Sequence, residues 1–406
     1  MTVIAELWRT WRAWRGAAWW PAVLLVTVQT VNGMWYMPQL SFFPIYLQEQ
    51  LGLTPAAIGG VVAGAQVTGM VAALLGGWIT GLLGSKWALV VGLIFSGLGS
   101  LAFQAHAIWL VAALSFAGGV GLAWITVGGS SYLTRLSSRG ALGMLAAIYA
   151  LSMTVGGAVG NPIAGMIIER HSFSAFGWAE TALIACGIAL AALGLTYQHD
   201  RSAGAAPMRA IWDGALPMTR RPRVQRLLGL RSLPTIFYGM LTVLIPLLIN
   251  ALSGSKVVVA AYGTTNLIVA SAAQLLAGRA ADRWGARGPT LAAYACVILA
   301  GLGLAATAET VWGLFLFGVF GVAAAWALST LMYVWVADGV PKAEHASSFG
   351  LLHAVWSLSM IVGSLLGGWL VHILPGLPFL VVGLLNVGSL FLARSYYRVP
   401  PAARSS

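Results

Sequence analysis

A chain of 406 residues with 59% hydrophobic and only 8% charged side chains is not a water-soluble domain, because soluble domains carry about 25% charged residues. The formal net charge of +12 comes from 22 Lys and Arg against 10 Asp and Glu. These cations fall in short segments between long apolar runs. This distribution is typical of a membrane topology signal and excludes nucleic-acid binding as their role.

Twelve apolar runs are each long enough to cross a hydrocarbon layer of about 30 Å as an α-helix. The runs are continuous and rich in Gly, Ala and Leu, whereas the strands of a membrane barrel alternate in polarity. The expected fold is therefore an all-α integral membrane protein with twelve transmembrane helices. The predicted spans are residues 21–46, 56–82, 87–104, 107–132, 141–168, 178–197, 233–252, 257–280, 289–308, 311–337, 349–373 and 377–394.

Basic residues also predict the orientation of the chain. With the N-terminus in the cytoplasm, 20 of the 22 Lys and Arg lie on the cytoplasmic side, and only Arg170 and Lys256 fall outside. We therefore expect a multi-pass protein of the inner (plasma) membrane with both termini in the cytoplasm. Residues 1–18 lack the apolar core and cleavage site of a signal peptide and form a basic segment, either a surface helix or a charged tail.

A polar segment, residues 198–232, separates six spans from six, and short segments repeat across it. The repeated pairs are 151–156 with 358–363, 119–124 with 321–326, and 74–77 with 275–278. Their separations are similar, between 201 and 207 residues. The sequence thus predicts two six-helix bundles, residues 19–197 and 233–395, joined by the cytoplasmic loop and flanked by the segment 1–18 and the tail 396–406. Parallel repeats of this kind place a binding site between the bundles.

The segment GRAADRWGAR at residues 278–287 resembles the loop signature of the major facilitator superfamily, and residues 77–86 carry a copy with Gly81 in place of the acid. The resemblance covers the whole chain, and residues 48–59 also resemble the family's first external loop. It implies a transporter with no enzymatic activity, whose loop stabilises the state closed to the cytoplasm; the alternative is a topology signal alone. The implied gating residues are Gly77, Gly84, Lys86, Gly278, Asp282, Arg283, Gly285 and Arg287.

The fifth span contains a glycine-rich stretch, GGAVGNPIAG at residues 156–165. It is similar, imperfectly, to a motif of drug–proton antiporters, which favours efflux. The alternative is a kinked and tightly packed helix.

In this family the first, fourth, seventh and tenth spans line the cavity. Helical spacing places Gln29, Asn32, Tyr36 and Gln39 on one stripe of the first span. Amide groups facing lipid would cost several kcal/mol, so the stripe should face water or another helix. The alternative to cavity lining is helix–helix hydrogen bonding, and for the tryptophans it is packing against lipid. The predicted substrate-binding residues are Gln29, Asn32, Trp35, Tyr36, Gln39, Trp124, Tyr238, Tyr262, Asn266, Trp326, Thr330, Tyr333 and Trp356.

None of the predicted spans has Lys, Arg, Asp or Glu deep within it, so a neutral or weakly cationic amphipathic or aromatic substrate is expected. His353 and Glu180 are the candidates for proton coupling, although a lone His is also a common packing residue. We predict a secondary active transporter that works by alternating access, with proton-coupled efflux favoured. The alternatives are a uniporter or symporter for a neutral sugar or polyol, and a membrane sensor or assembly factor that does not transport.

The expected partners are a small-molecule substrate, the lipid bilayer and protons as the coupling ion. No cofactor, metal site or catalytic constellation is expected, and Cys186 and Cys296 lie in predicted spans without a metal-binding pattern. Because one chain contains both halves of the site, we expect a monomer.

Overall fold

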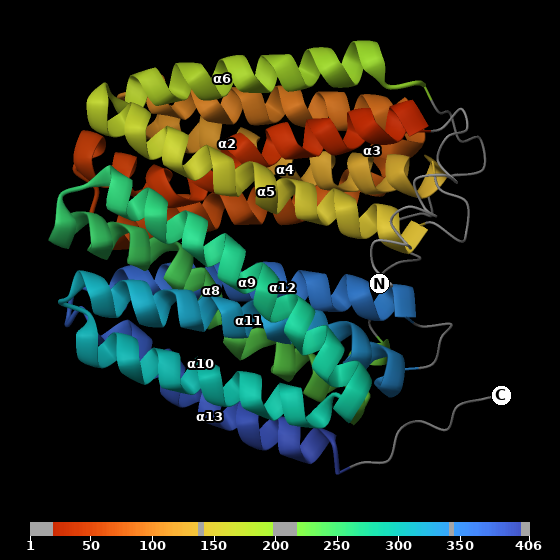
Figure 1. Cartoon of the computed structure of the whole chain (residues 1–406), viewed down its shortest axis with the longest axis vertical. Coiled ribbons are helices and arrows are strands. Elements are labelled where there is room, and N and C mark those ends of the chain that lie inside the picture. Colours follow the sequence, from red (N-terminus) through yellow and green to blue (C-terminus); the bar gives the residue numbers. More distant parts are fainter. Residues whose placement is uncertain (1–18, 137–141, 198–216, 341–344, 399–406) are drawn as a thin grey trace, which may run out of the picture. The chain divides into compact units, whose positions relative to one another are not determined.

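The computed structural model describes residues 19–136, 142–197, 217–340 and 345–398, and every regular element in these ranges is helical (Figure 1). The predicted segment 1–18, residues 198–216 of the central loop and residues 399–406 of the tail lie outside the described residues. The helices are α2 (Trp19–Leu51), α3 (Pro55–Ser100), α4 (Ile108–Leu136), α5 (Leu142–Arg170), α6 (Phe173–Ala189), α8 (Pro222–Ser253), α9 (Lys256–Trp284), α10 (Arg287–Thr307), α11 (Val311–Gly339), α12 (His345–Leu370) and α13 (Leu377–Tyr396). A 3-10 turn (Leu101–Gln104) follows α3, and a π-helical turn (Leu190–Gly194) follows α6.

Within the described chain, 11 helical segments are long and apolar enough to cross a membrane. Two of them, Pro55–Gly76 and Trp78–Gln104, lie along α3 and its 3-10 extension. The remaining span of the predicted twelve is α2, which has 33 residues but is less apolar because of its polar stripe. The all-helical membrane fold expected from the sequence is therefore confirmed.

Helices α8 and α6 begin five or more residues before their predicted spans. Helix α8 starts at Pro222, although the segment up to residue 232 was predicted as loop, which was wrong for residues 222–232. Proline at the first helical turn loses no hydrogen bond, and the buried side chains Val224, Leu227 and Leu230 give this extension an apolar face. Helix α6 starts at Phe173 because the Ser172 side chain accepts a hydrogen bond from the backbone N–H of Ala175.

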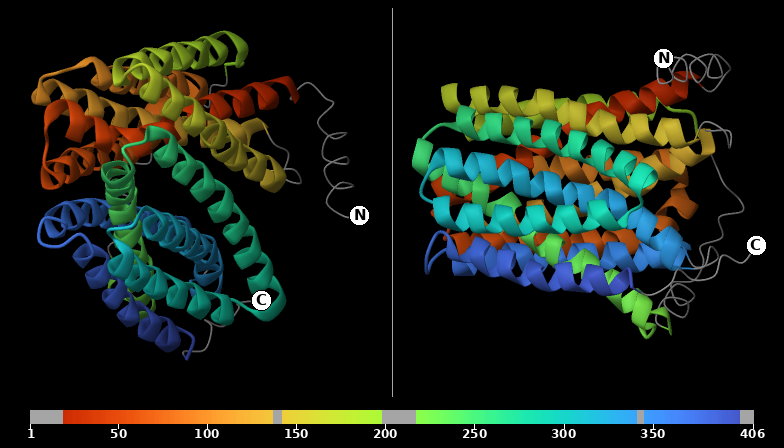
Figure 2. Two further views of the ribbon diagram at one scale, coloured as in Figure 1. Left: turned by 60° about the vertical axis from the view of Figure 1, so that its left-hand side comes forward. Right: turned by 60° about the horizontal axis from the view of Figure 1, so that its bottom comes forward.

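The chain divides into two compact units. The first unit comprises Met1–Gln39 and Thr68–Ala205, and the second comprises Leu40–Val67 and Ala206–Ser406. In the second unit α8 packs against α12, and α9 packs against α11. Figure 2 shows α10 and α13 running side by side in the same unit. The segment Leu40–Val67 contains the end of α2 and the start of α3. It belongs to the N-terminal half of the sequence but packs within the second unit.

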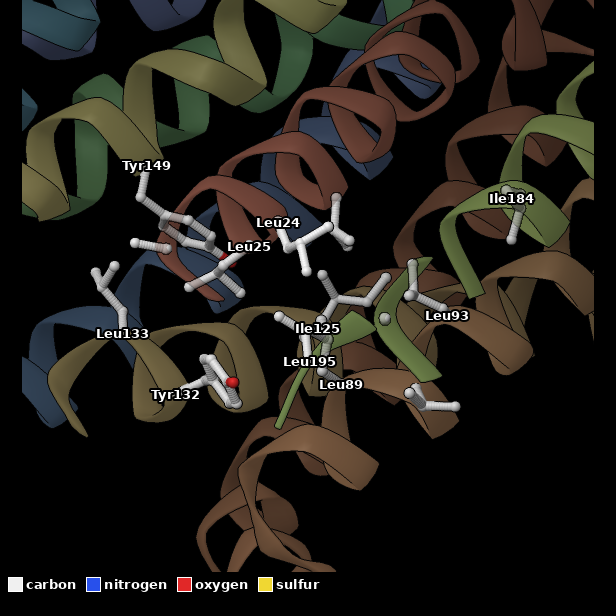
Figure 3. Packing of buried hydrophobic residues seen from close by; sticks show 14 of the residues in the cluster. Leu24, Leu25, Leu89, Leu93, Ile125, Tyr132, Leu133, Tyr149, Ile184 and Leu195 are labelled. Atoms are coloured by element: carbon white, nitrogen blue, oxygen red, sulfur yellow. The ribbon is translucent and has the colours of Figure 1, made fainter. Parts of the chain in front are cut away.

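The core of the first unit is a cluster of apolar side chains to which all of its long helices contribute (Figure 3). Figure 3 shows these side chains converging from the ribbons around them, with the Tyr149 ring beside Leu25. The labelled members of the cluster are Leu24, Leu25, Leu89, Leu93, Ile125, Tyr132, Leu133, Tyr149, Ile184 and Leu195. Since most of them are almost completely buried, they hold the first-unit parts of α2 and α3 together with α4, α5 and α6.

Helices α2 and α5 cross at backbone contact in the first unit. A methyl group added to Gly156 would overlap the carbonyl oxygen of Thr30, and one added to Gly160 would overlap that of Met34. From the other side, a methyl group on Gly33 would overlap the backbone of Met153. Glycines on both helices therefore permit the close approach, as small residues do at membrane helix crossings.

Helices α8 and α12 cross in the same way in the second unit. A methyl group on Gly363 would overlap the carbonyl oxygen of Ile236, and one on Gly239 would lie 2.8 Å from that of Met360. Each of these four residues is the sequence counterpart of one at the α2–α5 crossing, 206 or 207 residues earlier. The structural equivalence confirms the internal repeat that residues 151–156 and 358–363 predicted.

The loop glycines of the two motif copies share an unusual backbone conformation. Gly84 has φ 79° and ψ 158°, and Gly285 has φ 79° and ψ 156°. This region of the backbone map is essentially restricted to glycine, because a Cβ atom clashes with the residue's own backbone. Gly84 kinks α3 within the span Trp78–Gln104, and Gly285 follows the last residue of α9. The common conformation explains why both copies keep this glycine although only the second keeps the acid.

We expect Gly285→Ala to destabilise the protein by about 1–3 kcal/mol, because alanine at this φ and ψ is strained even though nothing lies within 4 Å of the added methyl group. Thermal unfolding of the purified protein in detergent measures the loss. The control is Gly288→Ala in the first turn of α10, where the added methyl group also meets open space but the backbone is helical. Equal melting temperatures for the two variants would contradict the expectation.

Gly363→Ala should also lower stability, by about 1–3 kcal/mol, because the new methyl group meets the Ile236 backbone of α8. The matched control is Gly388→Ala in α13, whose methyl group meets nothing within 4 Å. It should gain up to about 1 kcal/mol from helix propensity. Thermal unfolding of both variants measures the difference, and a Gly363→Ala protein as stable as the Gly388→Ala protein would show that the crossing is not tight.

Candidate functional site

The polar stripe of α2 is divided between packing and more open positions. Asn32 and Gln29 are buried, and the Asn32 side-chain amide donates to Gln29 Oε1 at 3.4 Å. Gln29 Nε2 in turn donates to the Met153 sulfur on α5 at 3.4 Å. Tyr36 and Gln39, further along the stripe, are only half-buried. The inner pair therefore serves the α2–α5 contact, whereas Tyr36 and Gln39 are the stripe residues with surface to offer a ligand.

The two tryptophans predicted in the first unit have packing partners. Trp35 is buried in the apolar cluster, and its ring meets that of Tyr36 edge-on, with centroids 5.9 Å apart. The Trp124 indole donates to the Ala72 carbonyl oxygen on α3 at 3.1 Å and meets Phe95 edge-on at 5.2 Å. Trp124 is half-buried, so one side of its ring remains accessible. Of these two, only Trp124 can combine a structural role with ligand contact.

An aromatic and polar face runs along α11 in the second unit. Trp326, Thr330 and Tyr333 follow one another at helical spacing, and the Thr330 hydroxyl donates back to the Trp326 carbonyl at 3.4 Å. Trp326 also hydrogen-bonds to Tyr238 on α8. The Tyr333 side chain is 60% exposed, which makes it the open end of this face. The face thus joins α8 to α11 and presents ring surfaces and hydroxyl groups together.

The two residues predicted on α9 lie differently. Tyr262 is buried, meets the Phe315 ring of α11 edge-on at 5.6 Å, and has its hydroxyl against Gly318. It therefore packs α9 against α11. Asn266, one turn further along, is half-buried, and its Oδ1 has no hydrogen-bond partner among the described residues. The Asn266 carbonyl oxygen is thus available to a donor on a ligand.

Helix α12 contributes a stacked pair. The His353 and Trp356 rings lie 5.4 Å apart with planes 19° apart. His353 is exposed and Trp356 is half-buried, so the pair presents a flat surface. His353 lies close enough to Arg231 of α8 for their charges to interact. The structure therefore brings the predicted residues His353 and Trp356 together with a cation that the sequence analysis did not include.

Arg231 was missed because the predicted span began at residue 233, so that Arg231 was counted as part of the loop. The structure places it inside α8, where its guanidinium group donates to the Ser329 hydroxyl of α11 at 3.1 Å. Ser329 precedes Thr330 on the same face as Trp326. If the segment from Pro222 onwards had been predicted as helix, Arg231 would have fallen on the same helix face as Tyr238, which lies seven residues later.

Glu180, the other candidate for proton coupling, lies in α6 of the first unit. Its carboxyl group is buried, and neither oxygen has a hydrogen-bond partner among the described residues. An ionised carboxylate in such surroundings would cost several kcal/mol. Glu180 is therefore a proton-binding group isolated from solvent. Glu180 belongs to the first unit, whereas the aromatic face belongs to the second unit.

The predicted gating residues occupy the two motif copies. Asp282, Arg283 and Arg287 are exposed, and the Arg283 guanidinium lies 5.5 Å from the centre of the Trp284 ring. Lys86 is buried, with its ammonium group 5.3 Å from the centre of the Trp87 ring. Gly278 faces the Thr330 methyl group at 3.8 Å. Gly77 lies in α3, and its packing falls outside what the structure describes.

Lys256, an exception to the predicted charge bias, is explained by an ion pair. Its ammonium group contacts Glu49 Oε1 and donates to Asn250 Oδ1 at 2.8 Å, and Asn250 Nδ2 donates to Glu49 Oε1 at 2.7 Å. The three residues come from α2, α8 and α9, all within the second unit. The sequence contained the signal, since Lys256 is one of only two basic residues predicted outside, but it did not identify the partner.

Among the described residues, no group of three or more His, Cys, Asp or Glu side chains could hold a metal ion. The residues described above present ring surfaces, hydroxyl and amide groups, a guanidinium group and two proton-binding groups, each within its own unit. Such groups bind and orient an organic molecule.

Comparisons with known proteins agree with this architecture. Solved structures with the same fold include the nucleoside transporter NupG (TM-score 0.75, 15% identity, 93% of this chain and 98% of that chain covered). A POT family transporter in complex with a thioalcohol-conjugated peptide has a TM-score of 0.73 at 13% identity, with 93% and 96% covered. A bacterial homologue of the human lysosomal transporter Spinster has a TM-score of 0.70 at 12% identity, with 96% and 99% covered.

No curated protein sequence matches the chain. The sequence profile described as Major Facilitator Superfamily matches residues 24–334 and, in an overlapping match, residues 235–406. The chain therefore belongs to the major facilitator superfamily, a family of membrane transporters rather than enzymes.

Proposed function

We propose that this secondary transporter moves a small amphipathic organic molecule with an aromatic or planar body, by alternating access of one site to the two sides of the membrane. The aromatic and polar face of the second unit carries this proposal. Tyr238 and Trp326 are joined there by a hydrogen bond, and Tyr333 is 60% exposed beside them. Stacking surfaces next to a few polar groups are typical of sites for such molecules.

The structure changes the substrate charge that was expected from the sequence. A neutral or weakly cationic molecule was predicted because no Lys or Arg lay deep in a predicted span. Arg231, inside α8 and beside the aromatic face, removes that premise. A cationic group next to Arg231 would be repelled, so a net positive charge is not part of the proposal, whereas the amphipathic aromatic body is retained.

Proton-coupled efflux is the proposed mode of transport. His353 is the stronger of the two candidate coupling residues, because it is exposed and stacks on Trp356 next to the proposed substrate face. The Glu180 carboxyl group is buried in the first unit without a hydrogen-bond partner among the described residues, and would need a conformational change to exchange its proton. The direction of transport rests on the glycine-rich stretch of α5, although Gly156 and Gly160 also serve the α2 crossing.

The membrane arrangement is proposed with it. Both termini lie in the cytoplasm of a cell whose inner (plasma) membrane holds the protein, and one chain acts as a monomer. The charge bias of the loops supports this orientation, and the exposed Asp282, Arg283 and Arg287 would gate the cytoplasmic side.

A second candidate function is uniport or symport of a neutral sugar or polyol, which would use the same amide and indole groups. The half-buried Asn266, whose Oδ1 has no partner among the described residues, favours this candidate because it can accept from a hydroxyl group. Saturable sugar uptake that lipophilic dyes do not inhibit would identify it. A membrane sensor or assembly factor is the remaining alternative, and it would be supported if the purified protein in liposomes moved no solute.

Flux through purified protein in liposomes tests the proposed site. The solutes are neutral sugars, lipophilic cations, aromatic amines and aromatic carboxylates. For a transported aromatic solute, Trp326→Ala should lower kcat/KM by about tenfold, because a stacking surface is lost. Trp312→Ala is the control, since Trp312 is 83% exposed near the start of α11. Equal kinetics of the two variants in folded protein would count against the aromatic face as the substrate site.

Proton coupling is tested in the same liposomes with a pH gradient. If His353 carries the coupled proton, His353→Gln should abolish proton movement that depends on substrate while downhill substrate flux continues, because glutamine does not titrate. Glu180→Gln is the companion variant and should retain proton movement. Loss of coupling in Glu180→Gln alone would transfer the role to Glu180, and unchanged coupling in both would show that neither residue carries the proton.

A further inference from the structure

Arg231 has no ion-pair partner among the described residues, whereas Lys256 pairs with Glu49. Its guanidinium group makes one hydrogen bond, to the neutral Ser329 hydroxyl, and its buried Nε has no partner among the described residues. A guanidinium group has five N–H donors arranged in a fork that matches two oxygens of one anion. A partly desolvated cation with unused donors is therefore poised to bind an oxyanion.

Asp338, the acidic residue of the neighbouring helix α11, interacts with groups other than Arg231. Asp338 lies at the end of α11, where its backbone carbonyl accepts from Arg223 and its charge acts on Tyr396 and Tyr397. It follows Ser329 by nine residues, about 14 Å along a helix that rises about 1.5 Å per residue. Asp338 is thus grouped with Arg223 rather than with Arg231.

Arg223, two turns earlier on α8, shows what a structural arginine looks like in this protein. Its guanidinium donates to the Asp338 carbonyl oxygen at 3.1 Å and lies 5.3 Å from the centre of the Tyr396 ring. It therefore joins α8 to the ends of α11 and α13. Among the described residues, Arg231 has no ring contact of this kind and no hydrogen bond to a carbonyl oxygen. These contacts to α11 and α13 distinguish Arg223 from Arg231, whereas the Nε atoms of both arginines are buried without a hydrogen bond among the described residues.

The groups around Arg231 suit the rest of an organic anion. Tyr333, one turn beyond Ser329 on α11, lies close enough to interact electrostatically with Arg231 and is 60% exposed. His353 of α12, which stacks on Trp356, is also close enough to Arg231 for their charges to interact. An anionic head on Arg231 would thus place an attached apolar or aromatic body next to ring surfaces.

We infer, on the basis of the proposed transport function, that Arg231 recognises a carboxylate or phosphate group of the substrate. Ser329 acts as a positioning residue that holds the guanidinium group, and Tyr333, His353 and Trp356 contact the body of the molecule. The substrate class is a small organic acid, or a zwitterion, with an aromatic or apolar body. The headgroup of an anionic lipid is a second source of the same chemistry.

Equilibrium binding to the purified full chain in nanodiscs of zwitterionic lipid tests the inference without requiring transport. The probes are benzoate, benzamide and benzylamine, which share a ring and differ in charge, together with inorganic phosphate. Benzoate should bind and raise the melting temperature, whereas benzamide and benzylamine should not. Arg231→Gln should weaken benzoate binding about tenfold to a hundredfold, the range for loss of a charge-assisted hydrogen bond.

Three further variants separate recognition from folding. Arg231→Lys keeps the charge but loses the fork, so it should retain weak binding of benzoate and of phosphate. Ser329→Ala should weaken benzoate binding less than Arg231→Gln does, and Ser329→Thr should restore it. Arg226→Gln, on a different face of α8, is the control and should bind benzoate as the unmodified protein does. If Arg231→Gln does not fold, the Arg231→Lys and Ser329 variants decide the question.

Equal binding of benzoate, benzamide and benzylamine, or equal benzoate binding with and without Arg231, would overturn the inference. Stabilisation by phosphatidylglycerol in the nanodiscs that depends on Arg231, without any response to benzoate or phosphate, would assign the site to a lipid headgroup and also overturn it. Because binding is measured without a gradient, failure to transport any solute in liposomes would refute the proposed function while leaving the oxyanion site to be judged by these binding data.

Discussion

Backbone contact between paired helices is the constraint on which the rest of the structure depends. The α2–α5 and α8–α12 crossings place glycines directly against the backbone of the partner helix. In lipid, where apolar side chains gain little from leaving the solvent, such contact is a main source of helix association. Because each crossing allows only one register, it also decides which face of α2 and of α8 points away from its partner.

The binding groups follow from this choice of face. On α2 the crossing buries Gln29 and Asn32 next to α5, and Tyr36 and Gln39 remain half-buried. On α8, Gly239 faces α12, whereas its neighbour Tyr238 reaches Trp326 of α11. A change of one residue in register would rotate these side chains by about 100° and disperse the aromatic face. The same contact therefore stabilises each unit and positions the groups proposed to bind substrate.

Buried polar groups of this protein differ in whether they have charged partners, and the difference indicates where function lies. Asn250, Lys256 and Glu49 satisfy one another, as a structural cluster must. Arg231 and Glu180 do not find charged partners among the described residues, and each carries a cost that packing alone does not require. Residues of this kind within membrane-spanning helices are expected to serve ligands or protons, because a neutral side chain would be more stable in the same place.

The sequence by itself determined the all-helical membrane fold, the positions of the spans and the internal repeat. The length of an apolar segment and the spacing of its glycines are local properties of the sequence. A membrane span can therefore be predicted from them without knowledge of the fold. Only the tertiary structure decided which polar residues are consumed by packing, as with Gln29 and Trp35, and which remain available, as with Tyr333. The tertiary structure also shows that Arg231, predicted in a loop, lies in α8. Val224, Leu227 and Leu230 form an apolar face there, and burying this face stabilises the helix only when neighbouring helices cover it.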